Sequence, residues 1–282
     1  MPTVTTTTGT AAGVPYLAVP PEGGPRPDAP VVVAWHLMDP PRTEAAFAAA
    51  LPLAGLDAWR VYLGLPLSGS RLPAGGFEEL MRLGYADAVL NLHGPVTDQA
   101  TAEFAPALAA LRTRLGFGDG PIGVVGGSMG AAVAALVLAE SEVPVDAAVL
   151  ISPIAQLEPV VTAMGRRFGV TYAWSRRSRE VAARLDFVAR GARLAGDRQP
   201  AVLLVVGEDD DQSGFQAPAR RLRDALARRY ADPSRVDLVT VPGMAHALAD
   251  EPGIEPAPQT PHAAVVDRHA VRWLARHLGS AA

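Results

Sequence analysis

The sequence predicts an α/β fold in which a mostly parallel central sheet is flanked by helices. Short apolar runs rich in Val and Leu recur along the chain, separated by longer segments with apolar residues at three- and four-residue spacing. Most of the runs do not alternate with polar residues, which is typical of strands buried on both faces of a parallel sheet. Strands and helices alternate as in βαβ units, so we expect residues 1–282 to form a single domain.

The elements follow one another in a regular order. Segments 4–8 and 14–19 flank a Gly-containing turn and predict an antiparallel hairpin at the sheet edge, and the Pro- and Gly-rich segment 20–30 predicts a loop. Buried strands are expected at 31–35, 59–63, 122–125, 147–151, 201–206 and 236–241, of which the last is the least apolar. Helices are expected at 43–53, 100–115, 129–139, 217–229 and 263–278.

One interval departs from this alternation. Residues 156–198, called the lid segment below, predict a mostly helical insertion with nine arginines against four acidic residues. A solvated basic surface is the usual explanation for such a charge excess. The alternative is a lid whose arginines bind an acidic group of a substrate.

Composition excludes several kinds of chemistry and several partners. All 25 basic residues are Arg and there is no Cys, which excludes Schiff bases, Ser-Lys dyads, thiol nucleophiles and disulfides. The net charge of −4 argues against nucleic acids and anionic membranes as partners. The N-terminus lacks the basic and apolar regions of a signal peptide, and the longest apolar stretch is far shorter than the ~20 residues of a membrane helix. We therefore expect a soluble, cytoplasmic protein.

The strongest motif is Gly126-Gly127-Ser128-Met129-Gly130, which matches G-x-S-x-G. It lies where the predicted strand 122–125 turns into the predicted helix 129–139. Small residues permit the sharp turn that exposes the serine hydroxyl, and the helix N-terminus directs N–H groups at the reacting oxygen. The motif predicts that Ser128 is a nucleophile, and a glycine-rich packing turn is the structural alternative.

A serine nucleophile needs a base and a third group that orients the base. Carboxylates follow the predicted strand 201–206, at Asp209, Asp210 and Asp211, and His246 follows the predicted strand 236–241. Because the carboxyl ends of parallel strands meet at one edge of the sheet, these side chains should lie near Ser128. The chain order of serine, acid and histidine is that of α/β hydrolases.

With these motifs, the sequence resembles the α/β-hydrolase superfamily, and the resemblance extends from Val31 to Leu278. The superfamily's Gly-x-x-Asp pattern points from Gly207 to Asp210 as the acid, with Asp209 and Asp211 as rivals, and it implies His246 as the base.

The resemblance also implies an oxyanion hole formed by the backbone N–H groups of Met129 and of Leu37 or Met38. Many members have His-Gly after the corresponding strand, whereas this chain has His36-Leu37. His36 is then expected to support this loop and not to act as a base.

The function that the resemblance implies is that of a serine esterase, which cleaves small-molecule carboxylic esters through a Ser-His-Asp triad and an acyl-enzyme. No cofactor or metal is expected. A thioesterase and a peptidase-like hydrolase are alternatives because the same triad serves these bonds, and a non-catalytic binding protein is a third. The sequence does not indicate the oligomeric state.

The remaining histidines have structural explanations. His93 is expected in a loop, with a role near the site as the alternative, and His262 at the start of the last helix. His269 and His277 share a face of that helix with Trp273 and are expected to be surface or packing residues.

Overall fold

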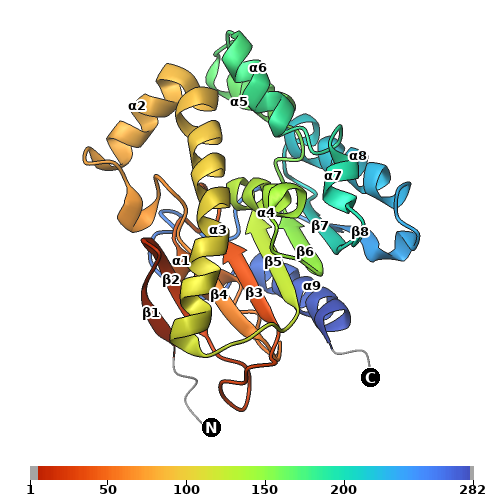
Figure 1. Ribbon diagram of the computed structural model, residues 1–282. Helices are drawn as coiled ribbons and strands as arrows, with labels where there is room; N and C mark the ends of the chain where they lie inside the picture. The colour runs from red at the N-terminus through yellow and green to blue at the C-terminus, as the bar shows by residue number, and fades with distance from the viewer. Residues whose placement is uncertain (1–5, 280–282) are drawn as a thin grey trace.

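The computed structural model describes residues 6–279 and contains one eight-stranded sheet with the order β1-β2-β4-β3-β5-β6-β7-β8 (Figure 1). β2 pairs antiparallel with β1 on one side and with β4 on the other, and the strands from β4 onward in this order are parallel to one another. The strands are β1 (Thr7–Ala11), β2 (Val14–Val19), β3 (Val31–Trp35), β4 (Trp59–Leu63), β5 (Ile122–Gly127), β6 (Ala147–Ile151), β7 (Ala201–Gly207) and β8 (Val236–Val241). The predicted mostly parallel sheet is confirmed.

The predicted strand bounds are correct for five strands, and three differ. β5 and β7 continue past the predicted ends to glycines, Gly127 and Gly207. The hairpin forms, but β1 begins at Thr7 instead of residue 4, and residues 4 and 5 lie outside the described part of the chain. The turn residues Ala12 and Gly13 both have positive φ, 49° and 82°, as a two-residue hairpin turn requires, and this turn sets the register of the pairing.

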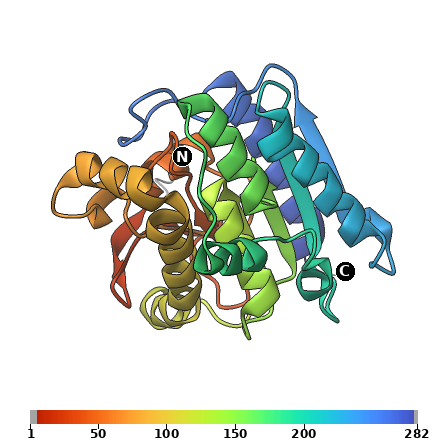
Figure 2. The same ribbon diagram turned by 90° about the horizontal axis from the view of Figure 1, so that it is seen from above.

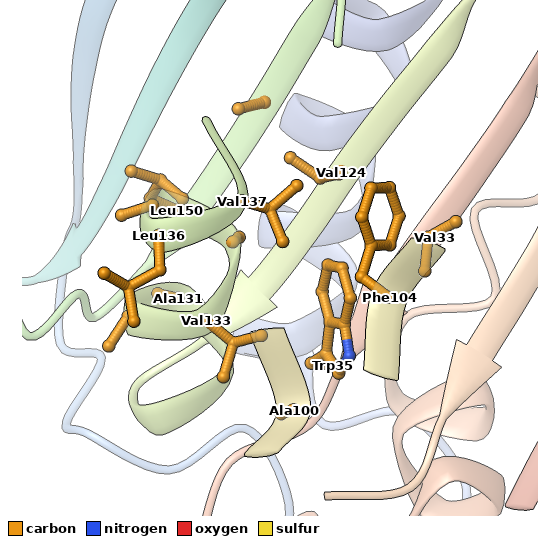
Figure 3. Packing of buried hydrophobic residues seen from close by; sticks show 14 of the residues in the cluster. Val33, Trp35, Ala100, Phe104, Val124, Ala131, Val133, Leu136, Val137 and Leu150 are labelled. Atoms are coloured by element: carbon orange, nitrogen blue, oxygen red, sulfur yellow. The ribbon is translucent and has the colours of Figure 1, made fainter. Parts of the chain in front are cut away.

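Helices cover both faces of the sheet. On one face, α1 (Glu44–Ala50) and α9 (Pro261–Leu278) pack on alternate residues of the central strands. On the other face lie α3 (Gly94–Leu115), α4 (Met129–Glu140), α7 (Gly191–Ala195) and α8 (Ala217–Ala227). Figure 3 shows the second core, where the rings of Trp35 and Phe104 lie 5.6 Å apart beside the apolar side chains of α4. Because α4 is buried along almost its whole length, the turn that precedes it is firmly supported.

The sequence analysis missed one helical region. α2 (Gly76–Ala88) leads through a π-helical turn, η2 (Val89–His93), into α3, which starts at Gly94 and not at residue 100. The prediction that His93 lies in a loop is therefore wrong, since His93 is a buried residue of the helical turn η2. Only Leu80 of α2 is buried, yet Phe77, Leu80 and Met81 have the three- and four-residue spacing of a helix, a signal that the sequence analysis missed.

The lid segment, residues 156–198, is mostly helical. It contains α5 (Leu157–Phe168), α6 (Arg176–Arg184) and α7. Figure 1 shows α2, α5 and α6 together above the carboxyl ends of the parallel strands, and in the view from above (Figure 2) the green α5 and α6 lie between the orange and yellow α2 and α3 and the blue-green α8. Within residues 6–279, no helix has both the length and the apolar character needed to cross a bilayer.

Candidate active site

Ser128 occupies a sharp turn between β5 and α4. Its φ of 48° and ψ of −106° are strained values for a residue other than glycine. A Cβ atom added at Gly126 would lie 2.1 Å from the carbonyl oxygen of Gly130, and one added at Gly130 would lie 2.3 Å from the carbonyl oxygen of Trp35. Only glycine fits at these two positions, so the sequence permits this turn and the surrounding packing maintains it.

His246 links Ser128 to Asp210 by two hydrogen bonds. The Nε2 atom of His246 lies 2.9 Å from Ser128 Oγ, and its Nδ1 atom lies 2.8 Å from Asp210 Oδ2. The side chain of Asp210 is 3% exposed, so its carboxylate faces the imidazole and not solvent. With Nδ1 donating to the carboxylate, Nε2 is free to accept the hydroxyl proton of Ser128.

Of the three candidate carboxylates, Asp210 is the one that contacts His246. The carboxylate of Asp211 points away and accepts the N–H groups of Ser213 and Gly214 at the start of η3 (Gln212–Gln216). Asp209 is exposed. This contact favours Asp210 over its two neighbours, and its role as the acid of a triad stays a prediction.

The close pairing of β7 with β8 brings the acid and histidine loops together. A Cβ atom at Gly207 would lie 2.1 Å from the carbonyl oxygen of Met244, so the histidine loop passes directly over the end of β7. The amide of Gln216 donates to the carbonyl oxygens of Glu208 and Asp210 and thereby holds the acid loop. The ring of Phe215 lies 4.2 Å from that of His246.

The sequence analysis missed Phe215 and Gln216. Both lie in the π-helical turn η3, where no motif or apolar period distinguishes them from any other residue after a strand.

A further carboxylate, Asp39, lies beside His246 and was also missed. Its Oδ2 atom is 3.8 Å from His246 Nε2, and its side chain is 56% exposed. Burial by itself lowers the pKa of His246, but the hydrogen bond to Asp210 and the charges of Asp210 and Asp39 outweigh burial and the opposing charge of Arg167, so the pKa is raised above its usual value. Asp39 lies just beyond the carboxyl end of β3, which is the only signal that could have suggested it.

The loop after β3 contains the predicted oxyanion residues. His36 is fully buried, its Nδ1 donates to the carbonyl oxygen of Leu37 at 2.6 Å, and its Nε2 accepts the N–H of Leu65 at 3.1 Å. Burial lowers the pKa of His36 to about 4, which keeps the ring neutral and suited to these two bonds. His36 therefore ties this loop to the segment after β4.

Leu37 and Gly127 fit each other. A Cβ atom at Gly127 would lie 2.3 Å from Leu37 Cδ1, so the leucine occupies space that the glycine leaves empty. Within residues 6–279, none of the N–H groups of Leu37, Met38 and Met129 donates to a backbone carbonyl. Leu37 and Met129 are buried, and the prediction that these N–H groups form an oxyanion hole stays a prediction.

The arginines of the lid segment are largely engaged within the protein. Arg184 pairs with Asp98 and Glu140, and Arg190 also pairs with Glu140, which links the lid segment to α3 and α4. Three more arginines of the segment have carboxylate partners, namely Arg166 with Asp211, Arg176 with Glu180 and Arg198 with Asp146. The local excess of arginine thus has a structural explanation at five of its nine positions.

Three histidines lie on α9. His262 is the second residue of the helix, as expected, and His277 packs its ring 4.4 Å from that of Trp273. His269 receives a hydrogen bond from Arg272.

Comparison with solved structures shows that the chain has the α/β-hydrolase fold. TT1662 from Thermus thermophilus matches with a TM-score of 0.65 and 20% identity over 98% of this chain and 99% of that one. The Pyrococcus furiosus esterase Pf2001 matches with a TM-score of 0.56 and 13% identity over 98% and 93%. A puromycin-hydrolyzing peptidase of Mycobacterium tuberculosis matches with a TM-score of 0.65 and 17% identity over 98% of this chain, which spans 40% of that protein. No protein-family model and no curated protein sequence matches the chain.

Proposed function

We propose that this protein is a serine hydrolase that cleaves carboxylic esters through a covalent acyl-enzyme. The observation that carries the proposal is the hydrogen-bonded series of Ser128, His246 and Asp210 at the strained turn before α4. A serine held in this conformation, with a histidine base and a buried carboxylate behind it, is the arrangement that acyl transfer requires.

In the proposed reaction, His246 Nε2 takes the hydroxyl proton as Ser128 Oγ bonds to the carbonyl carbon. The resulting oxyanion accepts hydrogen bonds from the N–H groups of Met129 and of Met38 or Leu37. In related chemistry, each such donor stabilises the transition state by about 3 to 4 kcal/mol. The bond to the leaving group then breaks, and the protonated His246 gives its proton to the departing oxygen. Asp210 stays ionised throughout and stabilises the imidazolium.

In the second half of the reaction, a water molecule takes the place of the leaving alcohol. His246 removes a proton from this water as it attacks the acyl carbon, and Ser128 leaves with that proton. The products are a carboxylic acid and the free enzyme.

Exposed apolar side chains near the carboxyl ends of the strands suit an acyl substrate of small size. Phe77, Met81 and Tyr85 of α2 and Met164 and Phe168 of α5 are among the exposed large apolar residues, and the rings of Tyr85 and Phe168 lie 6.5 Å apart. We propose that α2 and the lid segment together form the apolar walls of the acyl pocket, since apolar walls are usual in such pockets.

The alternatives differ in the bond that is cleaved. A peptidase-like activity draws support from the likeness to the puromycin-hydrolyzing peptidase, although that likeness is one of fold. A thioesterase acting on a phosphate-bearing carrier draws less support, because five of the nine arginines in the lid segment already have carboxylate partners.

Short p-nitrophenyl esters and a fluorophosphonate probe test the proposal. Ser128→Ala should lose at least about 10⁴-fold in kcat and should not be labelled by the probe. Ser234→Ala, an exposed serine of the turn before β8, is the matched control and should retain both. Equal turnover by wild type and Ser128→Ala would contradict the proposal, and faster cleavage of an anilide than of the ester of the same acid would favour the peptidase alternative.

A further inference from the structure

Asp39 is a carboxylate that the proposed triad does not use. It lies 3.8 Å from His246 Nε2, the nitrogen that also contacts Ser128. Among residues 6–279, no arginine lies within ion-pair distance of it, and its side chain is more than half exposed. A carboxylate at this point attracts positive charge, and its exposed side is open to a cation in addition to the protonated His246.

The loop that carries Asp39 is held on both sides of this residue. The Nε atom of Arg42 donates to the carbonyl oxygen of Met38 at 3.0 Å, and the N–H of Leu248 donates to the carbonyl oxygen of Pro40 at 3.0 Å. Arg42 is itself anchored by Glu251 at 2.8 Å. The backbone on both sides of Asp39 is therefore held, which lowers the entropy cost of using this residue in binding.

The position of Asp39 relative to Nε2 indicates which part of a substrate it faces. The leaving-group atom must lie about 3 Å from Nε2 to receive a proton. Given the 3.8 Å from Nε2 to Asp39 Oδ2, that atom lies within about 7 Å of the carboxylate. Groups attached to that atom can extend toward the carboxylate, so the charge of Asp39 is within reach of the leaving group.

We infer that Asp39 is a specificity-determining residue that favours substrates whose leaving group carries a cationic nitrogen, such as an amino alcohol. This inference rests on the proposed hydrolase activity and names the substrate class of the same site. An ammonium two carbons beyond the ester oxygen can reach Asp39 while the ester oxygen is near Nε2. The nearby cation Arg167 opposes Asp39 in its effect on the pKa of His246, and the effect of Asp39 is the larger of the two.

The test compares two esters of nearly equal shape and different charge. Butyrylcholine carries a trimethylammonium group where 3,3-dimethylbutyl butyrate carries a tert-butyl group. The ratio of their kcat/KM values removes any effect of Asp39 on the base itself, because both esters use the same His246. At a separation of about 6 Å in a largely aqueous setting, loss of the carboxylate should lower this ratio about three- to tenfold at low ionic strength.

Three variants make the test specific. Asp39→Asn should lower the ratio, and Asp39→Glu, which keeps the charge, should largely retain it. Asp250→Asn removes a charge from an exposed residue four positions after His246 and should leave the ratio unchanged. Tetramethylammonium should inhibit p-nitrophenyl butyrate hydrolysis by wild type more strongly than by Asp39→Asn, which gives a second readout if butyrylcholine is turned over slowly.

The inference and the proposed function can fail separately. Equal ratios and equal inhibition for wild type and Asp39→Asn would overturn the role of Asp39 even if Ser128→Ala is inactive. Undiminished turnover by Ser128→Ala would overturn the hydrolase mechanism itself. A larger fall in the ratio for Asp250→Asn than for Asp39→Asn would also overturn the inference, because the effect would then come from net charge.

Discussion

The contact between Leu37 and Gly127 can be tested by changing the size of each residue. Leu37 stands where many α/β hydrolases have glycine, and its side chain fills the space beside the glycine that precedes Ser128. Three variants are needed: Gly127→Ala, Leu37→Ala and the double variant. The φ of Gly127 is not positive, so alanine there meets a steric problem and no backbone problem.

The structure gives the size of each effect. A Cβ at Gly127 would lie 2.3 Å from Leu37 Cδ1, whereas ordinary van der Waals contact begins at 3.4 Å, so the leucine must shift by about 1 Å. Overpacking of this kind costs about 1 to 3 kcal/mol. Leu37 is fully buried, and its replacement by alanine should cost about 2 to 5 kcal/mol. In the double variant the alanine at 127 occupies part of the space that Leu37 vacates, so the two losses should overlap by about 1 to 2 kcal/mol.

Urea unfolding of wild type and the three variants measures this overlap as the coupling energy of a double-mutant cycle. The control cycle pairs Gly127→Ala with Leu136→Ala, a buried leucine of α4 in the other core, and should be additive within about 0.5 kcal/mol. Additive losses in the Leu37 cycle, or no loss for Gly127→Ala alone, would show that the two residues do not share this volume and would refute the reasoning.

Three further predictions concern charges. The kcat/KM of a neutral ester should rise with pH as His246 loses its proton, and Asp39→Asn, which removes a charge that raises the pKa of His246, should move this rise to lower pH in a pH–rate profile. Burial lowers the pKa of His93 to about 4 in the folded protein. Between pH 6.5 and 4 the unfolded state therefore binds more protons, and the free energy of unfolding decreases as the pH is lowered. In urea titrations, His93→Leu should reduce this decrease. Glu140→Gln should lower stability by about 0.5 to 1.5 kcal/mol, less in 1 M salt, because Arg184 and Arg190 lose a half-buried partner, which thermal melts can check.

Much of the fold could be predicted because buried parallel strands have a strong local signal. The run Val31–Trp35 is buried at every position, and its observed bounds equal the predicted ones. Edge elements were harder: β1 is largely exposed, and its position depends on the turn at Ala12 and Gly13, not on an apolar pattern. α2 was missed although Phe77, Leu80 and Met81 have the three- and four-residue spacing of a helix, and of these only Leu80 is buried.

The residues of the candidate site were also predictable only in part. Ser128 could be proposed from a motif whose glycines have a steric purpose, and His246 from its place after a strand. The choice among three adjacent carboxylates depends on the backbone path after β7, to which the side chains of Asp210 and Asp211 respond in opposite directions. The amino-acid sequence of this loop does not indicate that backbone path.

Asp39 shows what the loop after β3 contributes beyond the usual oxyanion donors. The same loop holds His36, whose ring fixes the carbonyl of Leu37, and the N–H of Met38. Through Pro40 it is bonded to Leu248, two residues after His246, so the carboxylate and the base belong to one connected unit. Because these contacts set their separation, the charge on Asp39 acts on every step in which His246 Nε2 gains or loses a proton. In the proposed mechanism a substrate must be compatible with a negative charge at that point, and we therefore expect the site to discriminate by the charge of the leaving group.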